Sequence, residues 1–230
     1  MKRLLSGLCI GASALLAGCA RPAPESGPPG SVPVQDWAAS AQYAQGIRLL
    51  VHESGTLNKP AEAYPWLLSA AKKGLPNAQA MVGLCLQKGW GVAVDEKEAE
   101  AWLLKSAEQG YSGAALLLAQ ICQGRGEADK TEAWLNAALA RGNAAPEAYI
   151  MLATLYSQRG EFHKAVGLLR LAAMDGSPEA AYRMSRCYEL GEGVPQDERL
   201  MLGWLKNAAD MGHKGAKQRL RELKRKPARS

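Results

Sequence analysis

Residues whose side chains could do chemistry are few and scattered in this chain of 230 residues. The three histidines are His52, His163 and His213, and none has a cysteine or carboxylate partner at a spacing typical of metal ligands. No serine, histidine and acid follow one another in the manner of a known hydrolase, although a triad assembled in space leaves no such pattern. We therefore predict no metal, no cofactor and no enzymatic activity.

Two glycine-rich segments resemble phosphate-binding loops at first sight. They are Gly89-Trp90-Gly91 and Gly191-Glu192-Gly193. A phosphate-binding loop of the P-loop kind follows a strand and continues into Gly-Lys-Ser/Thr, and neither feature is present. Because the pattern recurs at corresponding positions, we interpret both segments as structural turns.

The first residues have the layout of a secretory signal. Met1-Lys2-Arg3 is basic, and Leu4 to Leu16 is an apolar run too short to span a bilayer. The following Leu16-Ala17-Gly18-Cys19 resembles the bacterial lipobox. The resemblance implies that residues 1–18 are removed and that Cys19 is lipidated, as in palmitate-carrying lipoproteins. The alternative is an ordinary signal peptide that happens to contain a cysteine.

Ala20 stands where the inner-membrane retention signal of enterobacteria has aspartate. The lipobox resemblance therefore implies an outer-membrane lipoprotein of the bacterial envelope that faces the periplasm. Residues 19–36 are rich in Pro, Gly and Ser and poor in bulky apolar residues, so they predict a flexible tether.

The net charge of +6 is concentrated at the two ends of the chain. The segment 217–230 holds seven cations and one acid, whereas the body between it and the signal is nearly neutral. A nucleic-acid-binding domain needs a basic face built into its fold, so we expect no nucleic-acid partner. The basic end is either a solvated cap or an attachment to an anionic surface.

The body of the chain is a repeat with a period in the thirties. One marker is a glycine column: Gly74, Gly110, Gly142, Gly176 and Gly212. A second marker keeps the same spacings of 36, 32, 34 and 36 residues: Trp66, Trp102, Trp134, Leu168 and Trp204. Two markers that stay in step through changes of repeat length predict a solenoid.

Each repeat is expected to contain two helices. Over 77–88 the apolar residues Ala78, Met81, Val82 and Cys85 have the spacing of one helix face. Asp95 is placed to cap a second helix that ends before Gly110. In this second helix we expect tryptophan and leucine to fill the space between neighbouring pairs.

The segment Gly89 to Asp95, followed by Ala99-x-x-Trp102-Leu103 and Ala107-x-x-Gly110, resembles the Sel-one-like repeat (SLR), a relative of the tetratricopeptide repeat (TPR). Gly191 to Asp197 with Trp204-Leu205 repeats the match. The resemblance implies an all-α fold, a right-handed α-solenoid of antiparallel helix pairs. It also implies the following division: an N-terminal helix pair at 37–74, an SLR at 75–110, a degenerate SLR/TPR at 111–142, a TPR at 143–176, an SLR at 177–212, and a basic capping helix and tail at 213–230.

Two details of the ends follow from helix geometry. Pro65 would remove a hydrogen bond inside a helix, so we expect the second helix of the first pair to start near Tyr64 rather than to kink there. In the final helix, Ala216 and Leu220 should pack on the preceding pair.

Three cysteines remain in the body: Cys85, Cys122 and Cys187. Three cannot all pair, and equivalent positions of adjacent repeats lie roughly 10 Å apart, which is too far for a disulfide. We expect buried thiols. The chain thereby departs from cysteine-rich secreted SLR proteins, whose resemblance would imply penicillin-binding or β-lactamase activity.

By resemblance to TPR solenoids, the first helix of each pair lines a concave groove. The predicted partner-binding residues on these helices are Asn77, Gln87, Lys88, Gln120, Gln123, Ser157, Gln158, Glu179, Tyr182, Arg183, Arg186 and Glu189. Thr154 belongs to the same set. One end is rich in amides and hydroxyls, and the other is charged with an exposed tyrosine. Such a groove suits an extended peptide or a polar glycan, although solvated helix faces have the same polarity.

These expectations together favour a monomeric, lipid-anchored, non-catalytic scaffold. Its partner would be an envelope or secreted protein, or a polysaccharide, bound in the groove. The alternative function is a cell-wall-acting enzyme of the cysteine-rich SLR type.

Overall fold

The structure is a computed structural model that describes residues 38–52, 56–140 and 144–225. The predicted signal peptide, the tether and Cys19 lie outside these residues. The described part divides between residues 143 and 144 into two compact units. We call them unit 1 and unit 2 and consider each by itself.

The described residues form helices joined by short turns, with one isolated β-bridge between Val51 and Leu57. Unit 1 contains α2 (Ala39–Leu50), α3 (Pro60–Lys72), α4 (Pro76–Lys88), α5 (Glu96–Glu108), α6 (Ser112–Gly124) and α7 (Ala128–Leu139). Unit 2 contains α8 (Pro146–Gln158), α9 (Phe162–Met174), α10 (Pro178–Leu190), α11 (Glu198–Asp210) and α12 (Lys214–Arg225). The predicted all-α fold is confirmed.

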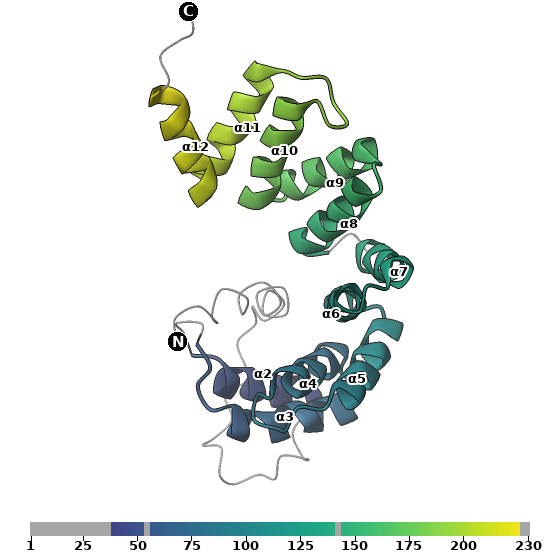
Figure 1. The fold of residues 1–230 in the computed structure, drawn as a ribbon. Coiled ribbons are helices and arrows are strands. Elements are labelled where there is room, and N and C mark those ends of the chain that lie inside the picture. Colours follow the sequence, from purple (N-terminus) through teal and green to yellow (C-terminus); the bar gives the residue numbers. More distant parts are fainter. Residues whose placement is uncertain (1–37, 53–55, 141–143, 226–230) are drawn as a thin grey trace, which may run out of the picture. The chain divides into compact units, whose positions relative to one another are not determined.

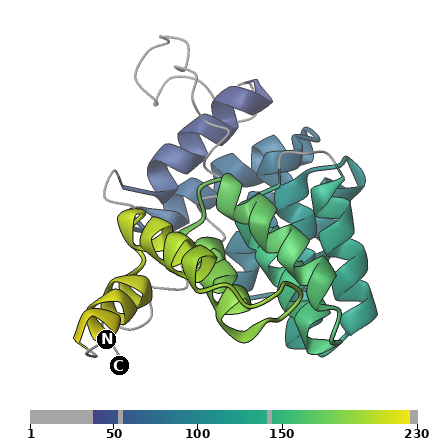
Figure 2. The same cartoon turned by 90° about the horizontal axis from the view of Figure 1, so that it is seen from above.

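Within each unit, every helix packs on the next along the chain (Figure 1). In unit 1 the first helices of two successive pairs, α4 and α6, also touch. In unit 2 the last helix, α12, packs against α11 and is drawn in yellow in Figures 1 and 2. No described helix is long and apolar enough to span a bilayer.

The core of each pair is a leucine from the second helix set against a small residue of the first. The buried leucines are Leu67, Leu103, Leu135, Leu169 and Leu205. The small residues at corresponding places in the first helices are Gly46, Gly83, Ala119, Ala153 and Ser185, and all are buried. A β-carbon at Gly83 would stand 2.7 Å from Cγ of Leu103, so the two helices approach closely because this residue has no side chain.

The tryptophan column lies one residue before these leucines and is only half-buried. Trp102, for example, donates its indole N–H to Glu98 at 3.2 Å and carries the ammonium of Lys105 4.7 Å from its ring centre. Its amphipathic ring therefore covers the edge of the pair, while Leu103 fills the interior. Trp102, Trp134 and Trp204 pack against the core while partly buried, in agreement with the expectation that tryptophan and leucine of the second helix fill space between helices.

The second helix of the first pair begins at Pro60, which corrects the predicted start near Tyr64. Pro60 occupies the first helical position, where the missing N–H would have no helical partner in any case. Pro65 lies inside the helix and leaves the carbonyl of Ala61 without its usual donor. Both residues are exposed, so water can satisfy this carbonyl.

Candidate functional site

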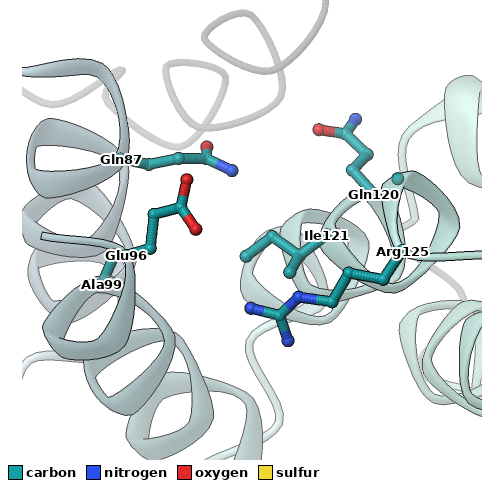
Figure 3. A pocket seen from close by; sticks show the side chains of 7 residues that line it. Gln87, Glu96, Ala99, Gln120, Ile121 and Arg125 are labelled. Carbon is teal, nitrogen blue, oxygen red and sulfur yellow. The ribbon is translucent and has the colours of Figure 1, made fainter. Parts of the chain in front are cut away.

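A recess of about 270 Å³ lies in unit 1 between the α4–α5 pair and α6. Its lining residues are Gln87, Glu96, Ala99, Gln120, Ile121, Gly124 and Arg125. Figure 3 shows Gln87 and Glu96 on one side of the hollow, facing Ile121 and Arg125 on the other. We call this hollow the unit-1 recess.

Gln87 and Gln120, two of the predicted groove residues, line the recess together. They lie in the carboxyl-terminal halves of α4 and α6, which pack against each other. Both side chains are half-buried, so each amide is held near the wall while remaining accessible. Their role in binding stays a prediction.

Sequence reasoning missed the rest of the lining. Glu96 is the first residue of α5, where the positive end of the helix dipole stabilises a carboxylate. Ile121 and Ala99 supply the apolar part of the wall, and they come from different repeats. The periodic spacing places each of them on a helix but contains no signal that joins them in one hollow.

Arg125 is fastened at the rim by a two-pronged ion pair. Its guanidinium nitrogens donate to the two carboxylate oxygens of Glu100, at 3.3 and 2.8 Å. Glu100 raises the pKa of Arg125 by accepting these hydrogen bonds. A planar fork of this kind fixes the arginine in orientation, so it forms a rim rather than a mobile arm.

The other predicted residues of unit 1 lie outside the lining. Lys88 and Gln123 are exposed at the carboxyl ends of α4 and α6. Asn77, at the amino end of α4, is half-buried, and its side-chain oxygen accepts from the N–H of Ala78 at 2.9 Å. Of the groove residues predicted in unit 1, the lining of the recess therefore includes only Gln87 and Gln120.

In unit 2 the predicted charged residues of α10 are engaged with their neighbours. Arg183 donates to Glu179 at 2.6 Å and to the hydroxyl of Thr154 on α8 at 2.8 Å. Glu189 accepts from Arg186 at 2.6 Å and from Arg219 on α12 at 2.8 Å. These contacts fasten α8, α10 and α12 to one another.

Both carboxylates remain ionised in this setting. Partial burial opposes ionisation of Glu179, but hydrogen bonds from Arg183 and His213 outweigh it and lower its pKa. Burial likewise opposes the ionisation of Glu189, and the hydrogen bond from Arg219 with the charge of Arg186 lowers its pKa.

Tyr182 is half-buried, and the expectation of an exposed tyrosine at this end is wrong. Its ring stacks on that of His213, with 4.4 Å between the ring centres. His213 accepts the N–H of Ala216 on its Nδ1 at 3.0 Å and so caps α12. Its Nε2 therefore carries the proton and donates to Glu179 at 3.1 Å. The sequence analysis found no carboxylate partner for His213 because Glu179 lies 34 residues earlier in the chain, in the preceding helix pair.

Ser157 and Gln158 close the predicted set, at the carboxyl end of α8. Ser157 is half-buried and Gln158 is exposed. Thr154, one turn earlier, donates its hydroxyl hydrogen to the carbonyl of Ile150 at 2.8 Å while accepting from Arg183. Thr154 is thus used internally, whereas Gln158 faces solvent.

The three body cysteines are buried on α4, α6 and α10 as free thiols. Burial raises the pKa of the Cys85 thiol to about 12 and also raises the pKa of Cys122 and Cys187. A thiol with so high a pKa is not a nucleophile at neutral pH. Their placement agrees with the expected role as small core residues.

The glycine turns pack against protein backbone where a phosphate-binding loop would need open space. A β-carbon at Gly91 would stand 2.0 Å from the carbonyl oxygen of Pro60, and one at Gly193 would stand 2.4 Å from that of Phe162. Each turn therefore rests on the first residue of the second helix of an earlier pair. No cluster of three or more metal-ligating side chains occurs among the described residues.

The Sel1-repeat family model matches residues 39–75, 76–111, 146–177 and 178–213, which is more than half of the chain. The chain belongs to the Sel1-repeat family. Each matched Sel1 repeat contains one helix pair of the structure, and the turns closed by Gly91 and Gly193 lie inside the second and fourth matches. The SLR resemblance drawn from the sequence is thereby confirmed, and this fold typically serves as a scaffold for protein–protein interaction.

Solved Sel1-repeat structures share the fold. A Sel1 repeat protein from Oxalobacter formigenes is 29% identical with a TM-score of 0.70, over 80% of this chain and 55% of that one. A protective antigen with an SLR fold, present in uropathogenic Escherichia coli strains, is 27% identical with a TM-score of 0.68, over 79% of this chain and 40% of that one.

Among curated proteins, DAP3-binding cell death enhancer 1 of Rattus norvegicus is 29% identical in an alignment 222 residues long, which covers 87% of this chain and 44% of that protein. The chain thus spans less than half of the length of this relative.

Proposed function

We propose that this Sel1-repeat protein is a lipid-anchored, non-catalytic scaffold of the bacterial envelope that binds an extended segment of another protein in the unit-1 recess. The observation that carries the proposal is the pairing of Gln87 and Gln120 across an open, partly apolar hollow. A relative whose name records binding to another protein, DAP3, supports an interaction role.

The lining of the recess favours a peptide over an apolar ligand. Side-chain amides offer both a donor and an acceptor, so Gln87 and Gln120 can pair with the main chain of an extended peptide. Ile121 and Ala99 offer an apolar seat for one side chain of the ligand. Glu96 is exposed and stands at the same hollow, so a basic residue in the peptide would be favoured.

A photo-crosslinking residue placed at Gln120 should give a discrete protein adduct in cells, because that side chain faces the recess. The same residue at Lys206, exposed on α11, is the control and should not give this adduct. With the partner identified, Gln87→Ala/Gln120→Ala should weaken its Kd by about 10- to 100-fold, and unchanged affinity would reject the recess as the site.

The lipid anchor is tested separately at the predicted acylation site. Cys19→Ala should move the protein from the membrane fraction to the soluble fraction after a wash in about 1 M salt, which screens electrostatic attachment. Metabolic labelling with a fatty acid should label the parent chain and not the variant. Label on the variant, or membrane retention after the wash, would contradict the lipid anchor.

A further inference from the structure

One side of α12 carries a line of cations. The helix, which runs from Lys214 to Arg225, holds six cations and one acid. Four of the cations lie within roughly a quarter of its circumference, given 100° per residue, and extend for about 15 Å along its axis. They are Lys214, Lys217, Arg221 and Lys224, and all four are exposed. We call them the basic stripe.

The opposite side of α12 packs against the rest of unit 2. Ala216 is fully buried and Leu220 and Leu223 are partly buried against the α10–α11 core, as the sequence predicts for Ala216 and Leu220. Arg219 is tied to Glu189 on α10, and His213 caps the helix while bonded to Glu179. The stripe is therefore held rigidly outward, and α12 has no free apolar face with which to insert into a bilayer.

The charges of the stripe are uncompensated within the described residues. The one acid of the helix, Glu222, lies to the side, where it contacts Gln218 at 3.0 Å and Arg219 at 3.6 Å. No ion pair or side-chain hydrogen bond joins any of the four cations to another described residue. Some cations on other helices and turns, such as Lys59 and Lys130, are paired with an acid three residues away.

We infer that the basic stripe docks on an anionic phospholipid surface. A straight, rigid line of point charges on one side of a helix fits a flat layer of lipid phosphates, and each cation near such a surface adds to the binding free energy. Neither α12 nor the sequence after it contains an aromatic residue, which disfavours a single-stranded nucleic acid, whose bases bind by stacking. The inference rests on the proposed envelope location. There the lipid on Cys19 and the basic stripe would together attach the protein to the membrane at two points.

The test uses residues 19–230 with Cys19→Ala, so that neither the predicted apolar signal segment nor an acyl chain contributes. We expect it to sediment with vesicles of phosphatidylcholine containing about one third phosphatidylglycerol, and not with phosphatidylcholine alone. Changing Lys214, Lys217, Arg221 and Lys224 to Gln should weaken the binding on the order of 100-fold. Binding of the parent should also fall sharply between about 0.1 and 1 M salt.

A matched control removes the same charge elsewhere. Lys72, Lys97, Arg199 and Lys206 are exposed on other helices and comprise the same three lysines and one arginine. Their change to Gln should leave binding within a few-fold of the parent. Circular dichroism should show equal helix content for both variants, since Gln is as good a helix former as Lys.

Three outcomes would overturn the inference: no binding to phosphatidylglycerol vesicles at low salt, equal loss in the stripe and control variants, or stripe-dependent binding to polygalacturonate without binding to vesicles. None of them bears on the scaffold proposal, because the crosslinking at Gln120 and the fatty-acid labelling of Cys19 are read out independently.

Discussion

Gly91→Ala is expected to lower the free energy of unfolding by about 3 kcal/mol or more. The residue has φ of +75°, a conformation that costs an alanine roughly 1–2 kcal/mol. The new methyl group would also stand 2.0 Å from the carbonyl oxygen of Pro60 and 2.7 Å from the nitrogen of Ala61. Both are backbone atoms, so relief requires moving the start of α3. Urea unfolding followed by circular dichroism measures the loss.

Gly74→Ala is the matched control, because Gly74 has φ of +90° with no atom within 4 Å of an added β-carbon. We expect it to cost only the conformational part, about 1–2 kcal/mol. The pair Gly193→Ala and Gly176→Ala should repeat the difference in unit 2, where only Gly193 meets a backbone carbonyl. Equal losses within each pair would show that the close approach of turn and helix is not a structural requirement.

Leu103→Ala is expected to cost about 3 kcal/mol, with a range of 2–5 kcal/mol for a fully buried leucine. The side chain fills the space above Gly83, which has no side chain to move into the cavity. Unit 1 should therefore be destabilised, as measured by the denaturation midpoint. Leu171→Ala, at a leucine that is 46% exposed, is the control and should cost less than about 1 kcal/mol.

A double variant sharpens this second prediction. Gly83→Ala alone places a methyl group 2.7 Å from Leu103 and should be destabilising through overpacking. In Gly83→Ala/Leu103→Ala that methyl occupies part of the vacated space, so the combined loss should be smaller than the sum of the single losses. Strict additivity would mean that the two residues do not share one packing site.

The repeat period and the all-α fold were predictable because both depend on local rules. A glycine is required where the chain adopts a left-handed conformation after a helix, as at Gly74 and Gly110, so turns leave a mark at every repeat. The apolar spacing of 77–88 likewise depends only on the helix period. The start of α3 was misplaced because Pro65 is tolerated on an exposed helix face, and exposure is not a local property of the sequence.

The candidate site was predictable only in part. Gln87 and Gln120 were found because both lie on the first helix of a repeat, and the resemblance to TPR solenoids places these helices along one groove. Glu96 and Arg125 were missed because their place in the recess depends on how α5 and α6 pack. Tyr182 was expected to be exposed, and it is covered because His213, one repeat later, stacks on it.

The sequence by itself determined the family, the helix pairs, the positions of the turns and the concentration of positive charge near the carboxyl end. These follow from residue types at short, regular spacing, where the backbone conformation decides. Only the tertiary structure decided which polar side chains are free for a partner. Glu179, Arg183 and Glu189 are used to fasten helices, whereas Gln87 and Gln120 line an open recess and the stripe on α12 faces outward. Whether such a side chain is bonded internally or accessible depends on the residues that other helices place opposite it. The spacing of residues along one helix does not contain that information.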